Sequence, residues 1–367
     1  MDFNLYMPVR VISGEDCILK NRKLFGQLGR RCLIMTGKQA AIKSGALNDI
    51  RASLDSQKID FTIFSEISAN PLLSQCQAAA AAADICNSDF IIGIGGGSVL
   101  DAAKAAAWLA TNPGSSGERL MQGRLRHPPL PLVLVGTTAG TGSEVSAVAV
   151  LTMDQSGQKK SIVDPNCYAE IVFADPRYTH SVPRDTTVST ALDAFAHTVE
   201  GWFSPGRGDV ITSFGEKALP LIMEGLTWLM ENEGLPSPQL RERMYYGSLW
   251  AGMVLNATGT AFPHTLGYIL TEDFNVPHGM ACAVFMPEFL KRAEEFLPEQ
   301  ARGLYKLCGG RQRVDSILDS LVKHDVHMTT EQISGYMPRW EGVRNFTRSP
   351  GGFTPQEAAR LLRKMFV

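Results

Sequence analysis

The sequence predicts an α/β N-terminal domain with a parallel sheet, followed by an all-α C-terminal domain. Short, continuous apolar runs alternate with helical segments in the first half of the chain, which is typical of strands covered by helices on both faces. After about residue 187, strand-like runs nearly disappear and apolar residues recur at helical spacing. The chain has 367 residues, more than one simple core usually holds. We therefore expect two domains.

Five segments of the first half are predicted to be buried strands because they are short, apolar and rich in branched side chains. They are residues 31–36, 61–64, 90–94, 131–135 and 171–174. Helices are predicted where alanine and leucine dominate or where apolar residues follow a helical period, at 73–85, 99–109, 240–256 and 286–296. The change of character near 178–185 separates a domain at 1–180 from one at 181–367.

Composition disfavours several classes of protein. The net charge of −2 gives no electrostatic footprint for nucleic acid or an anionic membrane. No apolar run approaches the ~20 residues of a membrane-spanning helix, and the first ten residues lack the features of a signal peptide. The seven cysteines are scattered without a C-x-x-C pair, so we expect reduced, mostly buried thiols. We therefore expect a cytoplasmic protein without nucleic-acid or membrane partners.

Two loops that follow predicted strands have the composition of a phosphate-binding site. Gly95-Gly96-Gly97-Ser98 stands between a strand and a helix, where glycines allow close approach and the helix N-terminus attracts anions. Ser98-x-x-Asp101 has capping-box spacing, which would start the helix there. A second loop at 136–144 is rich in glycine and hydroxyl side chains. The carboxyl ends of parallel strands bind nucleotides, so we expect a dinucleotide or sugar-phosphate site rather than two plain turns.

The helical half contains four candidate metal ligands. Asp193 and His197 are four residues apart in a helical segment, which puts both side chains on one face. His264 and His278 follow in the same half, 14 residues apart, with glycine and proline neighbours. One carboxylate and three imidazoles suit Fe²⁺ or Zn²⁺. Spacing alone does not show that the four meet, and a single buried histidine is more often structural.

These motifs together resemble the iron-containing, group III alcohol dehydrogenases, most of all the short 1,3-propanediol and alcohol dehydrogenase branch. The resemblance rests on GGGSVLDAAK at 95–104, TTAGTGSEV at 137–145, DAFAHTVEGWFS at 193–204, and the His264 and His278 segments in order. It spans nearly the whole chain and is weakest over the last sixty residues. It implies a dehydroquinate synthase-like fold with the active site between the two domains, and a homo-oligomer, dimeric or larger.

The resemblance also implies roles for individual residues. Asp193, His197, His264 and His278 match the metal ligands, usually for Fe²⁺ and in some relatives for Zn²⁺. The matching cofactor-binding residues include the pyrophosphate contacts Gly96, Gly97 and Ser98, the nicotinamide-side residues Thr137, Thr138 and Thr141, and the further positions Asn70, Asp101 and Lys159. The implied reaction is hydride transfer between NAD(P)(H) and a small primary alcohol or aldehyde.

Two positions depart from the common family pattern. Many NAD-preferring members carry an aspartate after the first long strand, where this chain has Gly37 followed by Lys38. Without that carboxylate a 2′-phosphate is not repelled, so we expect a preference for NADP(H), although a purely structural Gly37 would let both cofactors work. Many members also have a histidine four residues after the third ligand. Here it is Tyr268, so proton relay runs either through water and the cofactor ribose or with the participation of the Tyr268 hydroxyl.

Other functions remain possible on these residues. A zinc-dependent glycerol-type dehydrogenase or a dehydroquinate-synthase-like lyase would share the GGG loop and the dispersed ligands. A metal-free maleylacetate reductase is disfavoured by the intact Asp193 and His197 pair. A non-catalytic nucleotide-binding protein would have no use for the full ligand set.

Overall fold

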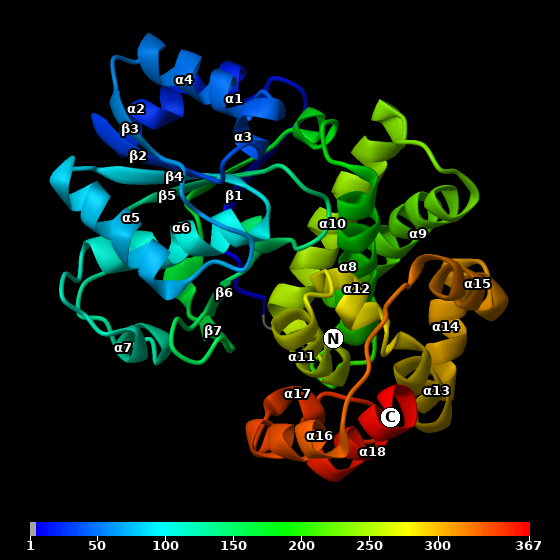
Figure 1. Cartoon of the computed structure of the whole chain (residues 1–367). Coiled ribbons are helices and arrows are strands. Elements are labelled where there is room, and N and C mark those ends of the chain that lie inside the picture. The colour runs from blue at the N-terminus through cyan, green and yellow to red at the C-terminus, as the bar shows by residue number, and fades with distance from the viewer. Residues whose placement is uncertain (1–4) are drawn as a thin grey trace. The chain divides into compact units, whose positions relative to one another are not determined.

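The computed structural model describes residues 5–367, and Figure 1 labels its helices and strands. Contacts divide these residues into two compact units. We call residues 5–183 with 237–245 the sheet unit, and residues 184–236 with 246–367 the helical unit. The short segment 237–245 therefore packs with the N-terminal part of the chain, although it lies far beyond the boundary expected from the sequence.

The sheet unit is built on a six-stranded sheet in the order β1-β8-β5-β4-β2-β3, and every neighbouring pair is parallel. The strands are β1 (Arg10–Ser13), β2 (Arg31–Thr36), β3 (Asp60–Phe64), β4 (Phe90–Gly95), β5 (Leu132–Gly136) and β8 (Ile171–Ala174). The predicted parallel α/β architecture is confirmed, with five strands placed to within one residue. The missed strand β1 is a short edge strand, and four residues give too weak a pattern.

Helices cover both faces of this sheet (Figure 1). One face packs on α1 (Cys17–Lys20), η1 (Arg22–Leu24), α2 (Phe25–Leu28), α3 (Ala40–Lys43) and α4 (Ala46–Ser56), with alternate strand residues such as Ile34 and Ile92 in the shared core. The other face carries α5 (Leu73–Ile85) and α6 (Gly97–Ala110). Gly93 of β4 is on this face, and a Cβ there would lie 2.7 Å from Ala103 of α6. The remaining short elements are α7 (Gly117–Met121), η2 (Ser143–Val145), η3 (Pro165–Cys167) and η4 (Pro176–Thr179).

A β-hairpin that the sequence did not predict joins the sheet unit. Strands β6 (Val148–Thr152) and β7 (Lys159–Val163) pair antiparallel outside the main sheet. Only alternate residues of β6 are buried and β7 begins with two lysines, so neither has the continuous apolar run of the other strands. The backbone N–H of Thr152 donates to Pro71 O at 2.8 Å, which holds the hairpin against the loop that contains Asn70.

The helical unit confirms the predicted all-α half, since no strand follows residue 174 within the described chain. Its helices are α8 (Arg184–Trp202), α9 (Asp209–Glu231), the part of α10 (Pro238–Thr258) after residue 245, α11 (Phe262–Phe274), α12 (His278–Ala283), α13 (Met286–Phe296), α14 (Pro298–Cys308), α15 (Arg311–Leu321), α16 (Thr330–Tyr336), η5 (Met337–Trp340), α17 (Arg344–Thr347) and α18 (Pro355–Phe366). Helix α8 is the most enclosed, and nearly every residue from Thr187 to Trp202 is buried. Its buried polar side chains therefore need polar partners.

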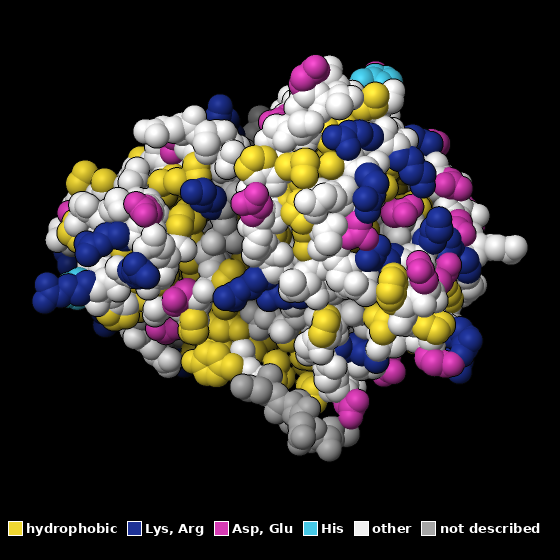
Figure 2. All heavy atoms as spheres, turned by 90° about the horizontal axis from the view of Figure 1, so that it is seen from below, with side chains coloured by type: hydrophobic (Ala, Val, Ile, Leu, Met, Phe, Trp, Pro, Cys, Tyr) yellow, Lys and Arg dark blue, Asp and Glu magenta, His cyan; other side chains and the backbone are white. Residues whose placement is uncertain are grey.

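On the face drawn in Figure 2, lysine and arginine side chains alternate with aspartate and glutamate, and apolar side chains lie between them. This face thus carries no broad region of one charge among the described residues. Within residues 5–367, none of the helices is both long and apolar enough to span a bilayer.

Candidate active site

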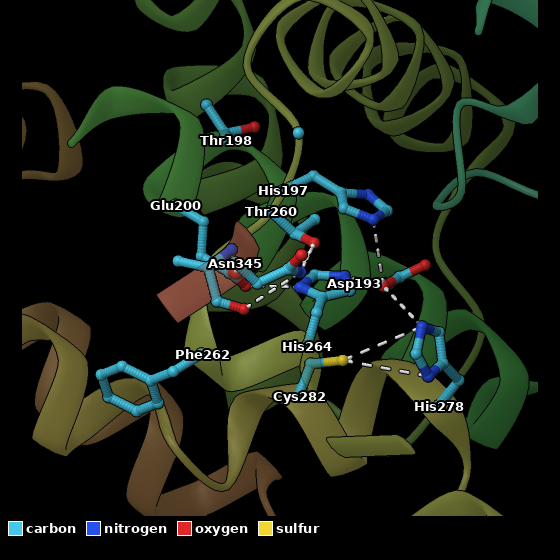
Figure 3. A network of polar contacts seen from close by, with 12 residues as sticks. Asp193, His197, Thr198, Glu200, Thr260, Phe262, His264, His278, Cys282 and Asn345 are labelled. Carbon is cyan, nitrogen blue, oxygen red and sulfur yellow. Dashed lines mark hydrogen bonds and ion pairs between the residues drawn. The ribbon is translucent and has the colours of Figure 1, made fainter. Parts of the chain in front are cut away.

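The four predicted metal ligands meet in the helical unit. Asp193 Oδ1 lies 3.7 Å from His197 Nε2, 3.5 Å from His264 Nε2 and 4.0 Å from His278 Nε2. The four side chains come from α8, α11 and α12 and point toward a common centre (Figure 3). Donor atoms bound about 2.1 Å from one ion lie roughly 3.4 Å apart in a tetrahedron, so these separations leave room for a divalent ion between them.

Three of the four side chains at the centre are buried, and the fourth is partly exposed. The side chains of Asp193, His197 and His264 are at most 6% exposed, whereas His278 is 27% exposed. Burial alone would raise the pKa of Asp193, but the surrounding imidazoles, His197 foremost, hold it well below its usual range. The centre therefore keeps a negative carboxylate in a dry environment, which is where a cation is bound most strongly.

Two buried atoms of the centre test whether an ion fits. Asp193 Oδ1 and His264 Nε2 are fully buried and have no hydrogen-bond partner within residues 5–367. An unsatisfied buried polar atom costs about 1–3 kcal/mol, and both atoms face the point on which the donors converge. A divalent ion at that point would satisfy both at once. The residues present therefore fit the ion that the donor chemistry implies.

Glu200 contacts one of the predicted ligands and was not predicted from the sequence. Its Oε1 lies 2.5 Å from His264 Nδ1, and its Oε2 accepts from the backbone N–H of Ala261 at 2.5 Å. A carboxylate accepts, so Nδ1 of His264 donates and Nε2 is left with its lone pair toward the centre. Asp193, His197 and Glu200 follow i, i+4, i+7 spacing on α8, and this spacing could have revealed the third residue.

Two glycines let the ligand-bearing helices approach closely. A Cβ on Gly279, the residue after His278, would lie 1.9 Å from Ser189 O and 2.7 Å from Asp193 Cβ. A Cβ on Gly267 of α11 would lie 3.0 Å from the sulfur of Cys282 on α12. Glycine at these positions is therefore required by the packing of α12 against α8 and α11. This packing brings His278 beside Asp193.

Tyr268 and Cys282 complete the surroundings of the centre. The ring of Tyr268 stacks on that of His278 at a centroid distance of 5.4 Å and an interplanar angle of 10°. The thiol of Cys282 is buried, and burial raises its pKa to about 11. The structure confirms that all seven cysteines are free and that six of them are buried. Cys282 was predicted to be one more buried core thiol, but it lies beside three of the four predicted ligands.

In the sheet unit, the two predicted nucleotide loops lie side by side. Strands β4 and β5 are parallel neighbours, and Gly95 pairs in register with Gly136. Both loops therefore begin at the carboxyl end of the sheet. A Cβ on Gly97 would lie 2.6 Å from the methyl of Thr141, and one on Gly96 would lie 3.2 Å from the side chain of Thr138. The close contact between the two loops therefore requires glycine at positions 96 and 97. A phosphate that approached the backbone here would require glycine for a second reason.

Two further predicted cofactor residues, Asn70 and Lys159, converge beside Ser98 of the first loop. Ser98 Oγ accepts from the backbone N–H of Asn70 at 3.2 Å, and Lys159 Nζ donates to Asn70 Oδ1 at 2.7 Å. Asn70 has a left-handed backbone with φ of 54°, a conformation that asparagine tolerates better than most residues. The hairpin β6–β7 brings Lys159 here from 89 residues away in the sequence, a contact that local spacing cannot predict.

The capping box predicted for Ser98 and Asp101 is wrong. Helix α6 begins at Gly97 with Gly96 as its N-cap and without a side-chain cap, because the glycine turn already brings the backbone into the helix. The carboxylate of Asp101, whose side chain is 14% exposed, instead supports the second loop. It accepts from Ser143 Oγ at 2.6 Å and from the backbone N–H of Val150 at 2.9 Å.

Lys104, one turn further along α6, joins the same buried network. Its Nζ donates to Ser143 O at 2.7 Å and to Val148 O at 2.6 Å, and lies 3.6 Å from Asp101 Oδ1. Burial lowers the pKa of Lys104 and raises that of Asp101, and each partially offsets the cost of burying the other. The pair ties α6, which carries the first loop, to the second loop and to β6.

The remaining predicted cofactor residues differ in exposure. Gly37 and Lys38 follow β2, which neighbours β4, so they lie at the same edge as the two loops. Lys38 is exposed and Gly37 is half-buried. A Cβ on Gly37 would lie 3.3 Å from Ile67 O. Thr137 is buried, and its hydroxyl has no hydrogen-bond partner in the described part of the chain.

Comparison with known proteins gives consistent matches over the chain. A family model described as iron-containing alcohol dehydrogenase matches residues 8–176, and a model for the C-terminal part of Fe-containing alcohol dehydrogenases matches residues 187–332. The chain is 30% identical to the 1,3-propanediol dehydrogenase of Klebsiella pneumoniae over 322 residues, 84% of this chain and 83% of the relative. It is also 30% identical to the sulfoacetaldehyde reductase of Bilophila wadsworthia, over 79% of this chain and 75% of the relative.

Solved structures agree with these matches. An iron-containing alcohol dehydrogenase from Thermotoga maritima superposes with a TM-score of 0.91 at 31% identity, over 99% of both chains. A sulfoacetaldehyde reductase from Bifidobacterium kashiwanohense in complex with NAD⁺ superposes with a TM-score of 0.86 at 26% identity, over 100% of this chain and 99% of that one.

Proposed function

Because this chain belongs to the iron-containing alcohol dehydrogenase family, we propose that Asp193, His197, His264 and His278 hold the divalent ion on which its activity depends. The chain is a metal-dependent, NAD(P)-linked alcohol dehydrogenase on the dehydroquinate synthase-like fold. The observation that carries the ligand assignment is the convergence of three Nε2 atoms within 4.0 Å of Asp193 Oδ1. Fe²⁺ is the metal of the family, and the same donors also accept Zn²⁺.

The roles of the chain's own residues follow from this arrangement. When bound, the ion supplies Lewis acidity toward the oxygen of the alcohol or aldehyde, which lowers the alcohol's pKa. Glu200 orients His264 through Nδ1 and so directs its Nε2 lone pair toward the centre. His278 is the most exposed ligand, so substrate reaches the centre on its side. Tyr268 stacks on the His278 ring, and we propose that its hydroxyl relays the alcohol proton toward solvent.

We propose that the loops of the sheet unit bind the cofactor. Gly96, Gly97 and Ser98 would contact the pyrophosphate at the start of α6, where the helix presents unpaired N–H groups. Asn70 donates its backbone N–H to Ser98 and accepts from Lys159, and Asn70 and Lys159 would close the same side. Thr138 and Thr141 of the second loop would contact the cofactor on its nicotinamide side. Asp101 serves better as a support, because its carboxylate is occupied by Ser143 and Val150.

We propose a preference for NADP(H) over NAD(H). Gly37 offers no carboxylate to a ribose diol, and the exposed Lys38 beside it offers a positive charge to a 2′-phosphate. The measurement is kcat/KM for NADPH and for NADH with one aldehyde. Replacing Gly37 with aspartate should reverse the preference. A wild-type enzyme that favours NADH would disprove this part of the proposal.

For the substrate we propose small primary alcohols and their aldehydes, since similar proteins are named for 1,3-propanediol and sulfoacetaldehyde. The free, mostly buried thiols suit a reducing compartment, so we propose a cytoplasmic location. We also propose a homo-oligomer, dimeric or larger, which light scattering of the purified protein would measure.

The test of the proposed function begins with metal-free protein. We expect Fe²⁺ added anaerobically to restore the oxidation of NADPH by short aldehydes, followed as loss of absorbance at 340 nm. Asp193→Ala should bind no stoichiometric metal and lose at least about 10³-fold in kcat/KM, since it removes the only carboxylate among the four proposed ligands. Circular dichroism should stay like that of the wild type. An Asp193→Ala protein that keeps its metal and turnover would refute the ligand assignment.

A further inference from the structure

The thiol of Cys282 belongs to the same cluster of donor atoms as three of the proposed ligands. One donor atom each from Asp193, His264, His278 and Cys282 all lie within 4.8 Å of one another. The sulfur is 3.9 Å from both ring nitrogens of His278, which precedes it by one turn of α12. Figure 3 shows the sulfur beside the His278 ring. The cluster therefore contains a sulfur donor that the three-histidine, one-aspartate set does not include.

The position of this sulfur is imposed by packing. Cys282 is fully buried, and a Cβ on Gly267 of α11 would lie 3.0 Å from its sulfur and 3.0 Å from its backbone nitrogen. The close approach of α11 thus leaves the thiol little freedom to turn away from the cluster. Cys282 also follows His278 at i+4, which places both side chains on one face of α12.

The distance between the Cys282 sulfur and His278 Nε2 is compared with the distance expected when both atoms bind one ion. Bonds of about 2.3 Å to sulfur and about 2.0 Å to imidazole nitrogen place the two donors roughly 3.0 Å apart at a right angle and roughly 3.5 Å apart at a tetrahedral angle. The 3.9 Å between the Cys282 sulfur and His278 Nε2 therefore has to shorten by about 0.4–0.9 Å when both bind one ion. A second observation points to the same place, because Asp193 Oδ1 and His264 Nε2 are buried without a hydrogen-bond partner in the described chain.

We propose that Cys282 is a sulfur ligand of the active-site ion, and that it shifts the metal preference of this chain toward Zn²⁺. The proposal rests on the metal site of the proposed function. Thiolate is a softer donor than carboxylate or imidazole and selects Zn²⁺ over harder ions. It also adds a second negative charge to that of Asp193, so a divalent ion is neutralised by the donor set.

Cobalt provides a direct readout, because thiolate bound to Co²⁺ gives an intense charge-transfer band in the near ultraviolet, whereas carboxylate and imidazole donors give only weak visible bands. Metal-free protein is titrated anaerobically with CoCl₂, as wild type, Cys282→Ser and Cys282→Ala. The matched control is Cys308→Ser, which removes another buried free thiol of the helical unit that is outside the cluster. We expect the near-ultraviolet band in wild type and in the control, and its loss in both Cys282 variants while the visible bands remain.

Each result separates this inference from the proposed function. Visible bands without a charge-transfer band in wild type, or a band that survives in Cys282→Ala, would overturn the sulfur ligand and leave the site itself intact. Absence of all cobalt bands in wild type would overturn both.

Metal selectivity gives an independent measurement. Wild type and Cys282→Ser are equilibrated with equal concentrations of Zn²⁺ and Fe²⁺, and the bound metals are measured by elemental analysis. We expect the Zn²⁺/Fe²⁺ ratio to fall about tenfold or more in Cys282→Ser, the order seen when a group that tunes a metal site is removed. An unchanged ratio would contradict the proposal.

Discussion

The metal centre of the helical unit and the loops of the sheet unit are built in different ways. The centre depends on ionisable side chains from α8, α11 and α12 whose donors meet in a buried space. The loops present backbone groups and hydroxyls at the edge of a sheet, and their glycines are required by contacts between the loops. We expect the metal centre, a site of converging charges, to lose its metal and activity abruptly when the helices shift. We expect the loops, which present backbone groups and hydroxyls, to lose affinity for the cofactor gradually.

Each site nevertheless has its own buried support. Glu200 holds His264 in the helical unit, and Lys104 with Asp101 holds the second loop in the sheet unit. In both cases a charged side chain that would contact neither the ion nor the cofactor holds the position of a group that would. The two supports can be broken separately, so the comparison can be tested unit by unit.

Among changes that leave every proposed metal ligand in place, the largest effect is expected from Gly279→Ala. The added methyl would lie 1.9 Å from Ser189 O, so α12 must move away from α8 and take His278 with it. We expect a loss of about 100-fold in kcat/KM, the order of effect of a misplacement near 1 Å, together with loss of bound metal. Gly335→Ala is the matched control, since a Cβ there meets nothing within 4 Å. Full metal occupancy in Gly279→Ala would show that the centre tolerates helix displacement.

A smaller and more selective effect is expected from Lys104→Met. Removing the buried ammonium leaves the largely enclosed Asp101 carboxylate without its cation. Breaking a buried ion pair typically costs about 3–5 kcal/mol of stability. The loosened second loop should raise the KM for the nucleotide about tenfold, as expected from losing one or two hydrogen bonds. Metal content should stay at the wild-type level. The measurements are thermal unfolding, nucleotide KM and elemental analysis, with the exposed Lys43→Met as control. A parallel loss of metal would contradict the independence of the two sites.

The smallest effect is expected from Ser98→Ala. This change removes the acceptor for the Asn70 N–H, and one such bond is worth about 1 kcal/mol, or roughly fivefold in affinity. We expect the Kd for the nucleotide, measured by quenching of protein fluorescence, to rise by that factor with kcat unchanged. A change of 100-fold or more would mean that the loops respond as steeply as the metal centre.

Local spacing determined a large part of this protein. The alternation of apolar runs and helices led to the parallel sheet, and the glycine loops were located because each stands at a strand end. Asp193 and His197 were assigned to one helical face because their four-residue spacing requires it. In each case the relevant partners lie within a few residues, where backbone geometry leaves few alternatives.

The tertiary structure alone decided the rest. It brought His264 and His278 to Asp193, because Gly267 and Gly279 let the helices approach closely. The same packing placed Cys282 among the ligands, and an unpredicted hairpin carried Lys159 to Asn70. These contacts join residues 71 to 89 positions apart or depend on which helix faces meet. No local pattern encodes that choice, since side-chain packing between elements makes it.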